Sequence, residues 1–198
     1  FHPDPTVKRQ SGLLTPFFTN STSVGFGFAQ PYYWAISDNK DLTFTPKLYA
    51  GENILFLNEY RQAFKNGFLI LDTSFTEGYK NTSATKTSGS RNHIFANLDI
   101  NFSESESYES NLLVKVQTTS NNTYFRIHDI NTALVKAENT NLENEIKYSF
   151  SKDDMYLDIN TSVYEDLRKD KSSDKYEYIL PNIMYGKTFF TEKYGTID

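Results

Sequence analysis

The chain of 198 residues contains no cysteine and no long apolar run. The first absence excludes a disulfide framework, a thiolate nucleophile and a cysteine metal site. The second absence, together with a negative mean hydropathy, excludes a transmembrane helix, which needs about 20 consecutive apolar residues. Neither absence excludes a transmembrane barrel, because a barrel strand needs only about 9–11 residues with every second one apolar and a wide barrel has a polar lumen.

Positive charge is also scarce. Lysine and arginine number 20 against 25 aspartates and glutamates, which gives a net charge of −5, whereas a nucleic-acid binder normally shows a basic stripe. The only adjacent basic pairs are Lys8-Arg9 and Arg168-Lys169, and we interpret both as solvated loop charges. The sequence therefore predicts no nucleic-acid partner.

Groups that could carry catalysis or bind a metal are few and scattered. The three histidines lie far apart and outside any ligand motif, and they are His2, His93 and His128. Two acidic pairs, Asp153-Asp154 and Glu104-x-Glu106, lie in polar turns that lack a calcium-loop glycine or a companion base. The chain has no nucleophile elbow and no P-loop. We predict no catalytic residue, metal site or cofactor, no enzymatic activity, and a structural or exposed role for each histidine.

Aromatic residues are abundant, with 14 Tyr and 16 Phe beside a single Trp, as in β-proteins with aromatic rims. Two segments alternate in the manner of strands. Val and Phe alternate with Gly and Ala over residues 24–29, and Leu, Phe and Pro alternate with Thr over residues 42–46. The intervening SDNKD, residues 37–41, predicts a tight polar turn.

Pro31 and Pro46 belong to these two neighbouring strands, where proline is disfavoured because it lacks the backbone N–H that a β-ladder needs. One proline in each strand removes hydrogen bonds from one place in the sheet, which we call the seam. The sequence predicts that the seam opens more easily than an ordinary strand pair. On these residues alone, the alternative is that both prolines lie at strand ends or edge positions, where ordinary sheets tolerate them.

Alternating segments continue along the chain and predict further strands. They cover residues 54–59, 68–75, 93–102, 108–119, 142–151, 155–164, 176–185 and 187–194. Over residues 93–102 an apolar face opposes an Asn and Asp face, as in a lipid-facing strand around a wet lumen, although a soluble sandwich also shows this pattern. The Ser-, Thr- and Gly-rich residues 77–91 predict a long exposed loop. Residues 125–138 predict a short helix or a loop folded against the barrel.

The stretch GFGFAQPYYWAISDNKDLTFTPKLY, residues 25–49, resembles the start of the barrel in the LptD family of outer-membrane lipopolysaccharide-assembly proteins. In that family a PYYW segment, a short polar turn and an LT-x-TP segment form the first two barrel strands. Both family prolines lie at a seam through which lipopolysaccharide leaves sideways. Residues 31–34 and 42–46 occupy these positions here, and residues 2–16 are similar to the family's link from its periplasmic jelly roll into the barrel.

The resemblance implies an all-β fold: an antiparallel transmembrane β-barrel segment of roughly nine or ten strands, preceded by the end of a periplasmic jelly roll. It implies that residues 1–16 are the end of the jelly roll with its linker, and that residues 17–198 are the N-terminal portion of the outer-membrane barrel. The implied function is non-enzymatic transport of lipopolysaccharide to the outer leaflet of the outer membrane.

The resemblance also assigns roles to particular residues and implies partners. Pro31 and Pro46 would form a lateral gate, and Tyr32, Tyr33 and Trp34 would be membrane-interface aromatics. The implied partners are lipopolysaccharide, an LptE-like plug lipoprotein inside the barrel and a periplasmic LptA-like bridge protein.

Two other functions stay open. A porin-like or substrate-uptake barrel would share the strands but not the proline pair, and a soluble β-sandwich adhesin would use the polar loops for binding. Because the chain begins at Phe1 and stops within a predicted strand, we expect it to be part of a longer protein. Strand counting from a periplasmic start puts the 77–91 loop on the periplasmic side, where barrel turns are usually short. Either a strand is miscounted or this loop is an exception.

Overall fold

The computed structural model describes residues 9–83, 88–103, 108–168, 172–191 and 195–197. The strands are β1 (Gly12–Leu13), β2 (Phe17–Ser21), β3 (Gly25–Ala29), β4 (Tyr32–Ser37), β5 (Lys40–Tyr49), β6 (Leu55–Phe64), β7 (Gly67–Thr76), β8 (Arg91–Asn101), β9 (Glu109–Thr119), β10 (Asn141–Lys152), β11 (Met155–Asp166), β12 (Tyr176–Lys187), β13 (Phe189–Thr191) and β14 (Gly195–Ile197). The helices among these residues are α1 (Tyr124–Ile127) and α2 (Ser172–Lys175), of four residues each. The fold is all-β, as the sequence predicts.

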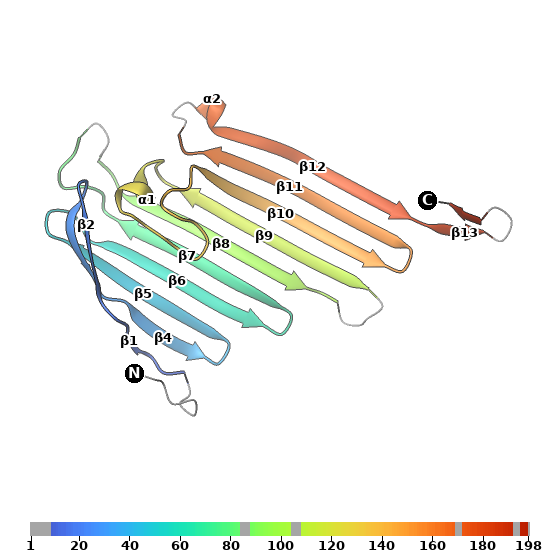
Figure 1. Ribbon diagram of the computed structural model, residues 1–198, viewed down its shortest axis with the longest axis horizontal. Coiled ribbons are helices and arrows are strands. Elements are labelled where there is room, and N and C mark those ends of the chain that lie inside the picture. The colour runs from blue at the N-terminus through green and yellow to red at the C-terminus, as the bar shows by residue number, and fades with distance from the viewer. Residues whose placement is uncertain (1–8, 84–87, 104–107, 169–171, 192–194, 198) are drawn as a thin grey trace. The chain divides into compact units, whose positions relative to one another are not determined.

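The larger sheet is antiparallel and open. Its hydrogen-bonded neighbours follow the order β1-β4-β5-β6-β7-β8-β9-β10-β11-β12, with β3 also paired to β5 and β2 paired to β3. From β4 to β12 each strand pairs with the next one along the chain (Figure 1), so these strands are a meander of hairpins. Such an open meander agrees with the predicted partial barrel.

The structure differs from the sequence prediction near both ends of the described chain. β1 and β2 are strands that the sequence did not predict. β1 has only two residues, and β2, with the sequence FFTNS, lacks alternation. Of the strand predicted over residues 187–194, the structure has Phe189–Thr191 as β13, and residues 192–194 lie outside the described residues. The ladder of β12 ends where Lys187 pairs with Met155, and β13 instead pairs with β14 in a separate two-stranded sheet.

The chain divides into two compact units. The first comprises Phe1–Ala63, Leu69–Ala96 and Gln117–Asn139, and the second comprises Phe64–Phe68, Asn97–Val116 and Thr140–Asp198. Both prolines of the predicted seam belong to the first unit.

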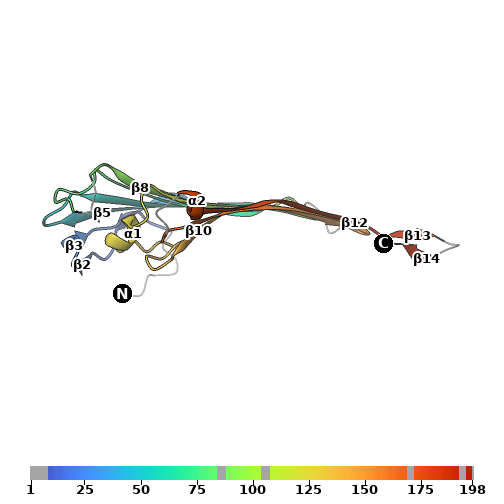
Figure 2. The ribbon, with the colours of Figure 1, turned by 90° about the horizontal axis from the view of Figure 1, so that it is seen from above.

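In the first unit the sheet has a covered face and an exposed face. Figure 2 shows α1 and the β2–β3 hairpin on the same side of β5 and β8, and we call that side the covered face. Tyr124 and Phe125 of α1 are buried, and so is Lys47 of β5. Successive strand residues point to opposite faces, so Phe44 and Leu48 of β5 lie on the other, exposed face.

The second unit contains the longest hairpin. β10 and β11 pair without irregularity from Asn141 opposite Asp166 to Lys152 opposite Met155. The turn between them has Asp153 at φ 47, the positive φ that a two-residue hairpin turn requires. Apolar side chains remain exposed on β12, among them Ile179, Leu180 and Ile183.

The connection between β7 and β8 is long, as the sequence predicts, and its described residues contain neither helix nor strand. It is not exposed throughout, because the side chain of Tyr79 is buried against His128 with ring centroids 5.4 Å apart. The strands before it include β1 and β2, which the sequence did not predict. The side of a membrane on which it lies stays a prediction.

Candidate functional site

The two prolines lie at neighbouring positions of one strand pair. The register runs unbroken from β3 into β4 along β5, so Gln30 lies opposite Pro46 and Pro31 lies opposite Thr45. β3 and β4 are therefore two halves of one strand, interrupted at Gln30 and Pro31. The seam that the sequence predicts corresponds to this interruption.

Each proline withholds a hydrogen bond from a different neighbouring strand. The Gln30 N–H donates to the Pro46 carbonyl at 3.3 Å, but Pro46 has no N–H with which to return the bond. The Leu14 N–H donates to the Pro31 carbonyl at 2.9 Å, and Pro31 cannot return that bond either. Pro46 thus weakens the ladder between β5 and the interrupted strand, whereas Pro31 weakens the ladder between β4 and β1.

The alternative placement at strand ends applies to one proline only. Pro31 directly precedes β4, which is a position where sheets tolerate proline. Pro46 lies inside β5, opposite Phe56 of β6 on its second side. A proline within a strand that is paired on both sides is unusual, and it makes Pro46 the more informative of the two.

The three aromatics after Pro31 do not share one surface. Tyr32 and Trp34 are 41% and 50% exposed and lie on the exposed face. Tyr33 points to the covered face, where its hydroxyl accepts a 2.9 Å hydrogen bond from Arg9 Nε. A role at a membrane interface stays a prediction for all three.

Aromatic rings gather on the exposed face beside the seam. Phe44 stacks on Phe56 of the next strand with ring centroids 5.9 Å apart. On the β2–β3 hairpin, Phe18 lies 5.7 Å from Phe26 and 5.4 Å from Phe28, centroid to centroid. Much of this apolar surface is open to solvent in the isolated chain, since Phe18 is 66% exposed.

A buried carboxylate, Asp41, lies on the covered face of the β4–β5 hairpin. Asp41 Oδ1 accepts a 2.8 Å bond from Arg61 Nε, and Asp41 Oδ2 is paired with Arg9. Arg61 also contacts Glu59 at 3.6 Å. Because two guanidinium groups converge on Asp41, its burial leaves no uncompensated charge. Arg9 precedes β1, so the ion pair ties the predicted linker to the first hairpin.

The family model described as "LptD protein" matches residues 1–192 of the chain. The chain belongs to the LptD family. The resemblance that residues 25–49 carry is thereby confirmed, and it extends over nearly the whole chain.

Relatives in this family cover different parts of the chain. The LPS-assembly protein LptD of Actinobacillus pleuropneumoniae serotype 5b (strain L20) is 43% identical over 60 residues, 30% of this chain and 8% of the relative. The LptD of Shewanella oneidensis is 28% identical over 183 residues, 90% of this chain and 22% of the relative. The LptD of Pseudomonas fluorescens is 24% identical over 159 residues, 80% of this chain and 16% of the relative. The chain thus spans at most 22% of the length of these relatives.

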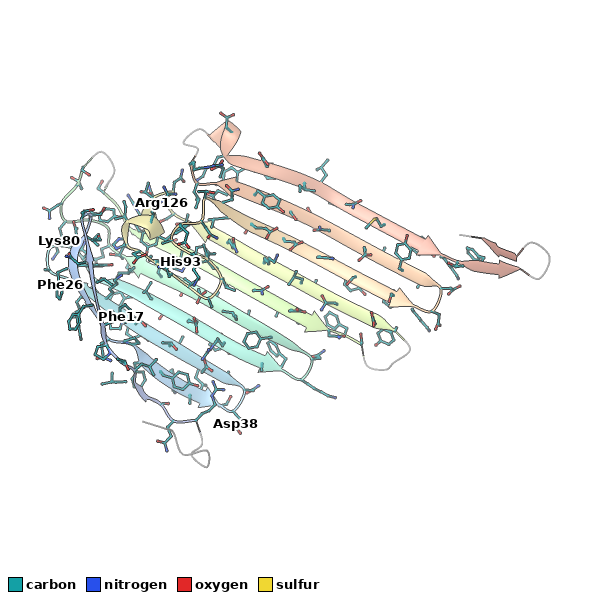
Figure 3. The ribbon with its side chains drawn as sticks, in the orientation of Figure 1. Phe17, Phe26, Asp38, Lys80, His93 and Arg126 are labelled. Carbon is teal, nitrogen blue, oxygen red and sulfur yellow. The ribbon has the colours of Figure 1, made fainter. Side chains whose placement is uncertain are left out.

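In this member of the LptD family, the connection between β9 and β10 folds back onto the covered face. Its anchor is Tyr124, which is 0% exposed and whose hydroxyl lies 2.7 Å from Ser74 Oγ of β7. Ser74 Oγ lies in turn 2.5 Å from His93 Nδ1 of β8, and Figure 3 shows His93 beside the helix that carries Arg126. Burial raises the pKa of the Tyr124 phenol well above its ordinary value, so the hydroxyl stays protonated and can donate to Ser74.

A second set of contacts fixes the end of α1. His128 follows the helix, and its Nδ1 lies 3.2 Å from the Tyr49 hydroxyl. Lys47 Nζ donates to the His128 carbonyl at 3.0 Å, and Asp129 then takes the left-handed φ of 48 that aspartate tolerates. His93 and His128 are thus structural, as the sequence predicts, whereas His2 lies outside the described residues.

Sequence reasoning missed this anchor. The prediction of a short helix or folded loop over residues 125–138 is confirmed, but the surface on which this segment packs is made of strands far away in the chain. The available signal was the apolar residues in an otherwise polar connection, since Phe125, Ile130 and Val135 are all buried.

A small cavity lies between the covered face and this connection. Its volume is about 180 Å³, and its lining includes Asp72, His93, Ile130 and Thr132. Asp72 Oδ2 and His93 Nε2 are buried without a hydrogen-bond partner among the described residues. Buried polar groups of this kind are ordinarily satisfied by water in a cavity of this size.

The described part of the chain offers no metal site and no membrane-spanning helix. It holds no group of three or more His, Asp or Glu side chains that could bind a metal. None of its helices is long and apolar enough to cross a membrane. The acidic pair Asp153-Asp154 forms the β10–β11 turn, and Glu104 and Glu106 lie outside the described residues.

Proposed function

We propose that this chain supplies the first barrel strands of a lipopolysaccharide-assembly protein in the outer membrane, with the end of a periplasmic jelly roll and its linker in residues 1–16 and barrel in residues 17–198. Membership in the LptD family supports this proposal. The observation that carries it is the seam, where two prolines at neighbouring register positions remove hydrogen bonds from adjoining ladders.

The seam would part to let lipopolysaccharide leave sideways. Acyl chains would move along the exposed face, where Tyr32, Trp34 and Phe44 present apolar surface. The sugar head group would cross the polar lumen, on the side of Asp41 and Arg61. Each backbone group that loses its partner in lipid costs several kcal/mol. Prolines that have already removed two such bonds lower the free energy of opening.

Other components would complete the pathway. The family implies an LptE-like plug lipoprotein inside the barrel and a periplasmic LptA-like bridge protein docked to the jelly roll. The chain has no P-loop, so the energy for transport would come from another component. No cofactor is required for this part of the pathway.

Photocrosslinking tests the proposal. The full-length protein carries a photoreactive amino acid at Tyr32, Trp34 or Ile146 and is reconstituted in phospholipid vesicles free of lipopolysaccharide. Lipopolysaccharide is then delivered only through the transport machinery. We expect adducts at positions 32 and 34 that appear while transport is running. Ile146 is the matched control, an apolar residue that is 52% exposed in the second unit.

The control separates passage through the seam from general lipid contact. Equal adducts at all three positions would mean that lipopolysaccharide reaches this face by diffusion in the membrane. An absence of adducts at 32 and 34 during active transport would exclude exit beside the seam. The second result would favour the porin-like alternative.

A further inference from the structure

Gln30 lies between the two prolines and hydrogen-bonds beside both. Its backbone N–H donates to the Pro46 carbonyl at 3.3 Å. Its side-chain Nε2 donates to the Leu14 carbonyl at 2.9 Å and to the Pro31 carbonyl at 3.2 Å. No other residue of the seam contributes to both ladders among the hydrogen bonds described here.

The bond to Leu14 fills the position that Pro31 leaves empty. β1 pairs with β4 through Gly12 opposite Tyr33 and Leu13 opposite Tyr32, so Leu14 comes opposite Pro31. In such an antiparallel pair each residue donates one bond and accepts one. The Leu14 N–H donates to the Pro31 carbonyl. The Leu14 carbonyl has no backbone donor opposite it, because proline lacks an N–H. The Gln30 amide supplies that donor.

Little else holds β1 in place at this point. Leu13 is 71% exposed and Leu14 is 45% exposed, so burial of their side chains contributes only part of the usual 1.5–3 kcal/mol per residue. The other contacts of this segment are backbone bonds, the bond that the Ala35 N–H donates to Ser11 Oγ at 2.9 Å, and the bonds of Arg9 to Tyr33 and Asp41 before β1 begins. At Leu14 itself the pairing of β1 with β4 therefore depends on few hydrogen bonds.

We propose that Gln30 is a positioning residue of the seam, whose side-chain amide replaces the missing N–H of Pro31 and holds the linker strand β1 on the outer edge of β4. The proposal rests on the proposed function for its transport role, although the bond itself does not. A backbone bond breaks only when a strand moves, whereas this bond breaks when one side chain rotates. Rotation of Gln30 removes one of the few bonds that hold the linker on the edge of β4 at Leu14.

Hydrogen exchange in the full-length protein, without lipopolysaccharide, tests the bond. Gln30→Met keeps the length of the side chain but removes its donor. We expect exchange of the Leu14 N–H to rise about tenfold, the factor that corresponds to one lost hydrogen bond of about 1.4 kcal/mol. Gln62→Met, on β6 and away from the linker, is the matched control and should leave Leu14 unchanged.

A rescue variant separates this role from a general loss of structure. Gln30→Met combined with Pro31→Ala returns a backbone N–H opposite Leu14, so protection of Leu14 should return to about the wild-type value. If Gln30→Met does not fold, Gln30→Glu serves instead, because a carboxylate of the same length accepts but does not donate. Unchanged exchange at Leu14 in the variant, or a rise that Pro31→Ala does not reverse, would overturn the proposal.

The transport role has its own readout. Crosslinking at Tyr32 and Trp34 reports on the proposed function, and exchange at Leu14 reports on the bond from Gln30. If no adducts form at Tyr32 and Trp34 but Leu14 exchange rises in Gln30→Met as expected, lipopolysaccharide exit is refuted and the Gln30 assignment stands. If adducts form at Tyr32 and Trp34 but Leu14 exchange does not change in Gln30→Met, only the Gln30 assignment is refuted.

Discussion

Replacing both prolines of the seam, Pro31→Val with Pro46→Thr, is expected to impair lipopolysaccharide export strongly while the protein accumulates to its normal level. Pro46→Thr restores an N–H directed at the Gln30 carbonyl, and Pro31→Val restores one directed at the Leu14 carbonyl. The bond that Pro46→Thr adds, of about 1 kcal/mol, lowers the open population about fivefold, and Pro31→Val adds less than this because the Gln30 amide already donates to the Leu14 carbonyl. Surface lipopolysaccharide and sensitivity to large antibiotics measure the effect.

The single variants and a matched proline make this result specific. Pro46→Thr should have the larger effect, because it strengthens the ladder between the first two strands of the meander, whereas Pro31→Val acts on the β1 pairing. Pro181 is the control, a strand proline of the second unit beside the irregularity in the β11–β12 ladder. Pro181→Val should leave export unchanged. Normal export in the double variant at normal protein level would exclude a gating role for the seam.

The adjacency of the two prolines could be predicted from the sequence, but the ladders that they weaken could not. A polar turn at Asp38 and Asn39 predicts that Pro31 lies directly opposite Pro46, and the register shift between Ala35 and Ser37 moves Pro31 by one position, to lie opposite Thr45. The direction of each missing N–H depends on whether a pair is hydrogen-bonded or not, and a shift of one residue reverses it. The sequence therefore indicates one weakened place, and the structure resolves it into two adjoining deficits.

The alternation of apolar residues was sufficient to predict the long strands, but it could not predict which segments pack on the covered face. β5 and β8 are predicted because every second side chain over residues 42–46 and 94–102 is apolar. The same period states which side chains share a face, but not which segment packs on that face. The contacts that hold α1 join four separate segments of the chain, through Tyr49, Ser74, His93 and Tyr124. No local pattern joins positions so far apart in the chain.

The covered face and the seam are linked through β5. Lys47 and Tyr49 at the end of β5 hold the α1 segment, and Pro46 immediately precedes them. β5 therefore carries the weakened ladder toward β4 and the anchor for residues 124–128. Because the α1 segment also contacts Ser74 of β7 and lies beside His93 of β8, we expect any opening of the first unit to occur on the β4 side of β5.

The anchor itself makes the second large prediction. Tyr124→Ala should detach residues 120–139 from the covered face, because it removes a fully buried ring and its hydrogen bond to Ser74. Truncation of a buried aromatic residue costs about 3–5 kcal/mol, and 3 kcal/mol corresponds to a more than 100-fold rise in local opening. Limited trypsin digestion of the folded full-length protein measures it, since Arg126 and Lys136 lie within the segment and its detachment should expose their backbone to the protease.

Tyr124→Phe is the matched control, because it keeps the ring and its T-shaped contact with His128 at 5.3 Å and loses only the hydroxyl. The loss of one hydrogen bond of about 1 kcal/mol should accelerate cleavage only about fivefold. A graded response, slow in wild type, modest in Tyr124→Phe and fast in Tyr124→Ala, identifies ring burial as the main force that holds the segment. If Tyr124→Ala were cut after Arg126 no faster than wild type, the remaining contacts of His128 with Lys47 and Tyr49 would be sufficient to hold α1, and the weight of the anchor would move from the helix to the residue that ends it.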